Sequence, residues 1–274
     1  VVATSLEETT AALQSVLSGE LVGAAGREVV LEECLQGEEV SFLVLTDGET
    51  ALPLAPTQDH KRVGDGDTGP NTGGMGAYCD DHIISDDLKV RVMNQIVYPT
   101  LRGMKAEGYP FRGVLYCGLM ITPNGPKVLE YNARFGDPET QALMVRLGSD
   151  LAQVLQEIAR GKLETNVLDW KHGASVCVVA CSAGYPGNYQ AGQLIHGLAD
   201  AENIGAKVFH SGSMRQNGQI LTAGGRVLGI TAAGNTLTEA RRRAYAAAER
   251  VNFHGIHYRH DIGQKGLQRA KPLE

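Results

Sequence analysis

The 274-residue sequence predicts a mixed α+β protein. Short apolar runs alternate along the chain with segments whose apolar residues recur every three or four positions, a mixture typical of strands and helices. The clearest strand signal is a pair of apolar runs around the turn tetrad Pro123-Asn124-Gly125-Pro126, which predicts a β-hairpin. Hydrophobic residues make up 43% of the chain and charged residues 20%, so a sizeable core is expected.

The first part of the chain combines one helix, three strands and a long loop. Ser5 and Glu8 fit a capping box, which predicts a helix from about residue 6 to 18. Strands are expected at about 28–34, 40–46 and 50–54. Residues 55–78 show no periodicity and carry four glycines between 64 and 73. This stretch is therefore expected to be a long loop, which in a compact protein is usually functional or disordered.

The remaining elements follow from apolar spacing and turn residues. Helices are expected at about 85–108, 139–147 and 150–161, and the hairpin strands at 114–122 and 127–133. The composition changes near residues 167–173, which predicts two domains, 1–168 and 169–274. The second domain is expected to contain strands at 174–183, 207–210 and 226–232 and a helix capped by Thr236 with Glu239.

Composition narrows the classes of function. A net charge of −6 argues against a nucleic-acid-binding protein. Five cysteines without CxxC spacing are expected to be reduced thiols in a cytoplasmic protein. The apolar run at 174–183 is about half the ~20 residues of a membrane helix, so no membrane role is expected. The chain begins with Val1 instead of Met, and we expect it to be a fragment.

The second strand of the hairpin carries a candidate metal site. Because strand side chains alternate between faces, Glu130 and Asn132 are expected to point the same way. A carboxylate and an amide oxygen suit Mg²⁺. Taken alone, such a pair is more often a solvent-facing polar pair on a half-buried sheet. The polar residues Arg134, Asp137 and Glu139 follow at once, which favours a site.

Two further clusters have both a functional and an ordinary interpretation. Residues 71–76, Asn-Thr-Gly-Gly-Met-Gly, could cradle an anion with their backbone N–H groups, and Lys61 and Arg62 lie just upstream. Most glycine-rich segments are simply surface loops, and no GK[ST] sequence closes this one as in a Walker A loop. Residues 32–39 hold four carboxylates, which taken alone are better explained as a solvated turn.

Together these motifs resemble those of the glycinamide ribonucleotide synthetase family, which belongs to the ATP-grasp ligases. The matching segments, in order, are 32–39, 58–62, 69–78 and 129–139, with 183–187, 224–228 and 258–263 similar to the C-terminal domain of that family. The resemblance implies the later part of an ATP-grasp fold followed by a small mixed α/β domain. Family members carry a further N-terminal domain and the first part of the ATP-grasp module, and the sequence that begins at Val1 is expected to lack both.

The resemblance also implies a nucleotide site. Glu32 to Leu35 would form the hinge that meets adenine, with backbone groups of Glu33 and Leu35 as its partners. Glu39 would bind the ribose, and Lys61 would lie near the phosphates and act in catalysis. ATP and Mg²⁺, or Mn²⁺, are the cofactors expected.

For the reaction, the resemblance implies that ATP cleavage joins glycine to 5-phosphoribosylamine through a glycyl phosphate, a step of de novo purine synthesis. Glu130 and Asn132 would hold the metal, and Arg134 would neutralise charge as the acyl phosphate forms. Asp137 is a further catalytic candidate and, with Glu139, would orient glycine. The residues expected near phosphoribosylamine are Asn71, Thr72, Gly73, Gly74, Met75 and Gly76.

Two alternatives stay open at this point. Another ATP-grasp ligase, such as a carboxylating one, would share Glu130 and Asn132 but would not need the loop at 71–78. A truncated product could bind nucleotide without turnover. In some eukaryotes the family's enzyme is also one unit of a longer multifunctional chain.

Overall fold

The computed structural model describes residues 1–20, 22–269 and 271–274. The chain divides into two compact units, Val1–Gly37 and Glu38–Glu274.

The first unit contains the helix α1 (Leu6–Leu17) and the short 3₁₀ helix η1 (Gly23–Arg27). The predicted helix at 6–18 is confirmed, and Ser5 caps it by accepting a hydrogen bond from the Glu8 N–H at 3.1 Å. The predicted strand at 28–34 is wrong. A strand needs a hydrogen-bonding partner along its backbone, and no strand among the described residues pairs with this segment.

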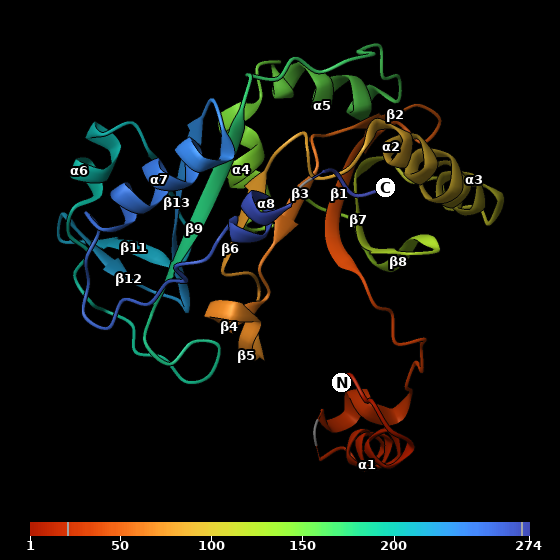
Figure 1. Cartoon of the computed structure of the whole chain (residues 1–274), viewed down its shortest axis with the longest axis horizontal. Helices are drawn as coiled ribbons and strands as arrows, with labels where there is room; N and C mark the ends of the chain where they lie inside the picture. Colours follow the sequence, from red (N-terminus) through yellow and green to blue (C-terminus); the bar gives the residue numbers. More distant parts are fainter. Residues whose placement is uncertain (21, 270) are drawn as a thin grey trace. The chain divides into compact units, whose positions relative to one another are not determined.

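The second unit is built on a nine-stranded sheet that is antiparallel along the described residues (Figure 1). The strand order is β10-β13-β9-β6-β3-β1-β7-β8, and β2 pairs with β1. Its strands are β1 (Glu38–Thr46), β2 (Ala51–Pro53), β3 (Thr57–Asp59), β6 (Gly76–Cys79), β7 (Gly113–Thr122), β8 (Gly125–Asn132), β9 (Ala174–Cys181), β10 (Lys207–His210) and β13 (Arg226–Gly234). Two small hairpins, β4 (Arg62–Gly64) with β5 (Thr68–Asn71) and β11 (Ser213–Gln216) with β12 (Gln219–Thr222), lie outside it.

Two apolar cores form because successive residues of a strand point to opposite faces. On one face, Phe42 of β1 belongs to a core shared with α2 (Asp86–Val92), the π-helical turn η3 (Met93–Val97), α3 (Tyr98–Ala106) and α7 (Leu237–Ala248). On the other face, the neighbouring Leu43 belongs to a core shared with α4 (Glu139–Arg146) and α5 (Leu151–Arg160). The short helices η2 (Asp65–Asp67), α6 (Leu198–Asn203) and α8 (Gln264–Gln268) complete the unit.

Most predicted elements from residue 40 onward are confirmed, including the hairpin, the helices near 85–108, 139–147 and 150–161, and the helix capped by Thr236. The expectation of one long loop at 55–78 is wrong. This stretch contains β3, β4, β5 and β6, and β3 and β6 lie inside the large sheet. Their partners are β1 and β9, which are remote enough in sequence that local patterning does not show them.

The sheet runs without interruption from the first half of the chain into the second. β6 pairs with β9 from Gly76 opposite Val178 to Cys79 opposite Ser175. At Gly76 a Cβ would lie 2.6 Å from the Cys177 carbonyl oxygen, so the two strands can approach only because this residue is glycine. The boundary at 168/169 remains a prediction.

None of the helices in the described part of the chain is both long and apolar enough to span a bilayer. All five cysteines are free thiols, as predicted, and only Cys34 is exposed.

His60 is a buried titratable group that follows β3 directly. Its side chain lies next to Tyr78, and its Nδ1 is 3.2 Å from the Gly76 carbonyl oxygen. Its Nε2 is buried without a hydrogen-bond partner among the described residues. Burial, together with the positive charges of Arg259 and Lys265, lowers the pKa of His60 to about 4.

This histidine makes stability depend on pH. Between pH 6.5 and about 4 the unfolded chain binds a proton at His60 that the folded chain excludes, so stability falls as the pH is lowered through this window. The loss should reach about 3 kcal/mol at the lower end. Urea denaturation of wild type and His60→Gln at several pH values should show a flatter dependence in the variant. Equal slopes for wild type and His60→Gln would contradict the assignment.

Candidate functional site

Strand register gathers polar side chains on the α4 face of the sheet. Residues opposite each other on antiparallel strands point to the same face. Ser41 pairs with Thr57 of β3 and with Gly118 of β7, and Gly118 pairs in turn with Glu130. The polar side chains placed on this face are Glu39 and Ser41 of β1, Thr57 and Asp59 of β3, Tyr116 of β7, and Glu130 and Asn132 of β8.

A cavity of about 170 Å³ lies at this face. It is lined by Asp59, Lys61, Thr72, Gly73, Tyr116, Glu130, Asn132, Arg134, Gly136, Asp137 and Glu139. The structure thus brings together every residue that the sequence nominated for the metal, for catalysis and for glycine, along with two residues of the glycine-rich loop.

Glu130 and Asn132 form the part of the cavity that suits a cation. They are two positions apart on β8 and share a face, with the Asn132 Nδ2 3.3 Å from the Glu130 Oε1. The Arg134 guanidinium donates to the Asn132 Oδ1 at 3.4 Å. The described residues contain no group of three or more His, Cys, Asp or Glu side chains placed to hold a metal. This donor set fits Mg²⁺, which often takes one or two protein oxygens and completes its shell with phosphate and water.

Two further carboxylates, Asp59 and Glu139, line the same cavity. Glu139 is only 2% exposed, and its Oε1 accepts hydrogen bonds from the Tyr116 hydroxyl at 2.6 Å and the Ser41 hydroxyl at 2.9 Å. Asp59 accepts one from the His60 N–H at 2.7 Å. Burial and the charge of Glu139 raise the pKa of Asp59 well above its usual range. Lys61 and Arg226 offset the repulsion between these two enclosed carboxylates only in part, so the pair favours a ligand with a positively charged group such as an ammonium.

Lys61 supplies a fixed positive charge. Its Nζ lies 2.7 Å from the Glu39 Oε2. Burial opposes the charge of Lys61, but the carboxylates of Glu39, Glu130 and Asp59 together outweigh it and raise the pKa of the ammonium group. The Lys61 backbone carbonyl accepts hydrogen bonds from both the N–H and the hydroxyl of Thr72, which tie the glycine-rich loop to this residue.

The glycine-rich loop divides into an open part and a packed part. Thr72 and Gly73 line the cavity, whereas Asn71 is exposed at the end of β5. Gly74 has φ +114°, and a Cβ there would lie 2.9 Å from an oxygen of Asp59. The Met75 side chain is fully buried, with its Sδ 3.7 Å from the Cys181 Sγ, and Gly76 packs on β9. The predicted contacts of this loop with substrate remain predictions.

The predicted nucleotide hinge lies in the first unit. Glu32, Glu33 and Leu35 are part of the irregular segment after η1, and Glu39 belongs to the second unit. Their contacts with adenine and ribose remain predictions.

Sequence reasoning missed Asp59 and Tyr116, which line the cavity, and Ser41 and Arg226, which bind residues of its lining. Asp59 had a usable signal, because it stands two residues before Lys61 and an extended chain would place the two on one face. Ser41 and Tyr116 are recognisable only through their contact with Glu139. Arg226 comes from β13 and donates to the carbonyl oxygens of Gly73 and Asp137, a contact no local pattern predicts.

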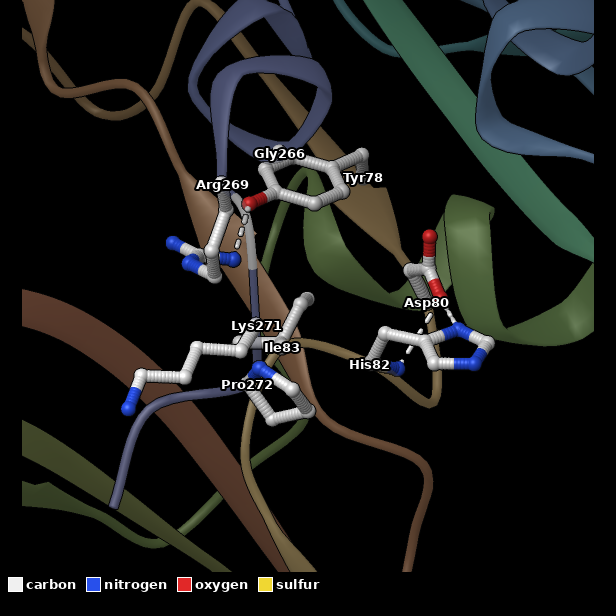
Figure 2. Close-up of a pocket in the computed structure, with 8 residues that line it drawn as sticks. All are labelled: Tyr78, Asp80, His82, Ile83, Gly266, Arg269, Lys271 and Pro272. Carbon is white, nitrogen blue, oxygen red and sulfur yellow. Dashed lines mark hydrogen bonds and ion pairs between the residues drawn. The ribbon is translucent and has the colours of Figure 1, made fainter.

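A second cavity of similar volume, about 170 Å³, contains Arg269, Tyr78, Asp80 and His82 among its lining residues (Figure 2). The Arg269 guanidinium forms an ion pair with Glu38 and donates to the Tyr78 hydroxyl at 3.2 Å. His82 lies 2.9 Å from Asp80. The Asp80 carboxylate is thus next to His82 and the Arg269 guanidinium is paired with Glu38, and the lining has no carboxylate and amide pair like Glu130 and Asn132.

Two family models match this chain. The model described as "Phosphoribosylglycinamide synthetase, ATP-grasp (A) domain" matches residues 1–140, and the model described as "Phosphoribosylglycinamide synthetase, C domain" matches residues 175–265. A phosphoribosylamine–glycine ligase from Vibrio cholerae is 51% identical over 272 residues, which cover 99% of this chain and 63% of the relative. The chain therefore spans less than two thirds of the length of this curated relative.

Solved structures agree with these matches. The crystal structure of a phosphoribosylamine–glycine ligase from Thermotoga maritima superposes with a TM-score of 0.85 and 34% identity, covering 96% of this chain and 65% of that one. A biotin carboxylase domain from Hydrogenobacter thermophilus gives a TM-score of 0.63 at 14% identity, covering 92% of this chain and 53% of that one, and shows the shared fold alone. The fold is ATP-grasp-like with a C-terminal domain, as predicted. The chain belongs to the phosphoribosylglycinamide synthetase family.

Proposed function

We propose that this chain contributes the phosphoryl-transfer and glycine sites of a phosphoribosylamine–glycine ligase. In the proposed reaction ATP drives the joining of glycine to 5-phosphoribosylamine, with glycinamide ribonucleotide, ADP and phosphate as products. The observation that carries the proposal is one cavity with two kinds of site, a cation-binding oxygen pair at Glu130 and Asn132 and the enclosed carboxylates Asp59 and Glu139. The names of the relatives support it.

At the phosphate end, Glu130 and Asn132 would hold Mg²⁺ or Mn²⁺, which when bound offsets the charge of the ATP phosphates. Lys61 and Arg134 line the same cavity. When the glycine carboxylate oxygen attacks the γ-phosphorus, the bond between that phosphorus and the β,γ-bridging oxygen breaks and ADP leaves. The positive charges of Lys61 and Arg134 would stabilise the charge on the transferring phosphoryl group.

At the glycine end, Asp59 and Glu139 would bind the ammonium group. Tyr116 and Ser41 donate to one oxygen of Glu139 and so fix the carboxylate. The Asp137 carboxylate is engaged by Arg226 at 3.2 Å and by the Gln141 amide at 2.8 Å. We therefore propose that Asp137 acts on glycine by fixing the loop that leads into Glu139.

In the second step, the amine nitrogen of phosphoribosylamine attacks the glycyl carbonyl carbon and phosphate leaves with its bonding electrons. The proton that the amine loses passes to the released phosphate or to water. Thr72 and Gly73 lie at the cavity. We propose that the loop 71–76 approaches the phosphoribosyl group, and that Glu32, Glu33, Leu35 and Glu39 contact the nucleoside.

The free thiols fit the cytoplasmic compartment proposed for this reaction. The proposal extends to a place within a longer multifunctional chain.

A carboxylating ATP-grasp ligase is the competing assignment, since a biotin carboxylase domain shares the fold. Bicarbonate carries a negative charge and no ammonium group. Placing it beside Asp59 and Glu139 would bring like charges together. The nearby Lys61 and Arg226 do not cancel this repulsion, because the pKa of Asp59 stays raised in their presence. The carboxylate pair therefore favours an amino acid over bicarbonate.

ADP release tests the reaction class. With the protein at the full length of its gene product, release should require glycine and phosphoribosylamine together, and bicarbonate should not replace glycine. Glu130→Gln should lower kcat by about 100-fold or more because a metal ligand is lost. Glu49→Gln, which changes an exposed carboxylate paired with Lys105, should match wild type. Release that ignores glycine, or an unaffected Glu130→Gln, would reject the proposal.

The glycine end has its own test. Glu139→Gln keeps the size of the side chain and removes its charge, so the KM for glycine should rise about 10- to 100-fold while the KM for ATP changes little. Steady-state kinetics with glycine and ATP varied separately measure both constants. Glu164→Gln, at an exposed carboxylate paired with Lys162, is the matched control. An unchanged KM for glycine would remove Glu139 from the glycine site.

A further inference from the structure

We infer that Arg226 and Tyr185 are positioning residues that fix two loops of the cavity relative to each other. Both come from the segment matched to the C-domain model. The inference rests on the proposed function for its kinetic consequence. Arg226 begins β13, and its Nη1 donates to the Gly73 carbonyl oxygen at 2.6 Å and to the Asp137 carbonyl oxygen at 2.7 Å. Its Nη2 lies 3.2 Å from the Asp137 Oδ2. One guanidinium thus bridges two loops that are remote in sequence.

Tyr185 binds the other backbone polar group of Gly73, its N–H. The Gly73 N–H donates to the Tyr185 hydroxyl at 2.9 Å, so both backbone polar groups of Gly73 are bound by side chains from the segment 175–265. The fit is close. A Cβ on Gly73 would lie 2.9 Å from the Arg226 Cζ, and a Cβ on Gly225 would lie 2.3 Å from the Tyr185 ring.

The bridged loops carry the chemistry proposed above. Thr72 and Gly73 line the cavity from one loop, and Asp137 and Glu139 line it from the other. Gly74 packs so closely that a Cβ there would lie 2.5 Å from the Pro138 Cδ. A charged donor shared by two carbonyls and a carboxylate gives stronger and more directional hydrogen bonds than neutral donors. Loss of Arg226 would leave those acceptors without it and allow the two loops to separate.

Arg226 therefore acts on the reacting groups through the loops. Small displacements of positioned groups cost rate more than binding. The cavity is consequently incomplete without the segment matched by the C-domain model, even though Glu130, Asn132, Lys61 and Glu139 all lie before residue 141.

The test combines hydrogen exchange with kinetics. Hydrogen–deuterium exchange measured by mass spectrometry on the 274-residue chain should show faster exchange of peptides covering 71–76 and 134–140 in Arg226→Met, with exchange in β1 and β7 unchanged. Tyr185→Phe, which removes one hydroxyl, should affect the 71–76 peptide alone. Arg226→Lys should be intermediate, because an ammonium group cannot reproduce the planar fork of the guanidinium. Arg215→Met, at an exposed arginine of β11, is the matched control.

In the full-length protein, Arg226→Met should lower kcat by about 10- to 100-fold with less than a threefold change in the KM for ATP. Wild-type kcat and wild-type exchange in Arg226→Met would overturn the inference, as would faster exchange spread evenly over the whole sheet. Absence of glycine-dependent ADP release in the wild-type protein would instead overturn the proposed function, and the exchange experiment would still decide whether Arg226 holds the loops.

Discussion

The pairing of β6 with β9 is the contact on which the rest of the second unit depends. β6 is the only link in the strand order between β3, which carries Asp59, and the strands β9, β13 and β10 of the second half, within the described residues. Gly76 makes this contact possible, since a Cβ would strike the Cys177 carbonyl oxygen. The loop that precedes β6 is thereby brought against Arg226, at the start of β13.

Charge is distributed unevenly within the cavity. Lys61, Arg134 and the Glu130–Asn132 pair suit polyphosphate with its cation, whereas Asp59 and Glu139 suit a positively charged amine. Burying Glu139 is costly, and the hydroxyls of Tyr116 and Ser41 offset part of that cost by donating to it. A bound ammonium group would offset more of that cost.

Local sequence patterns were sufficient where structure depends on near neighbours. The hairpin around residues 123–126, the helices and the shared face of Glu130 and Asn132 all follow from periodicity and turn residues. The short strands β3 and β6 were missed because their partners are distant in sequence, and an apolar pattern at 28–34 was misread because no strand pairs with it. Arg226 was missed for the same reason as β6, since its role exists only after the two halves have joined one sheet.

Locating a bound cation tests the central claim most directly. Crystals grown with Mn²⁺ and ADP, with diffraction measured at the manganese absorption edge, would give the ion's position independently of activity. The assignment predicts an anomalous peak within bonding distance of a Glu130 carboxylate oxygen and the Asn132 amide oxygen, with phosphate oxygens completing its shell. A peak between Asp59 and Glu139, or in the cavity at Arg269, would contradict it.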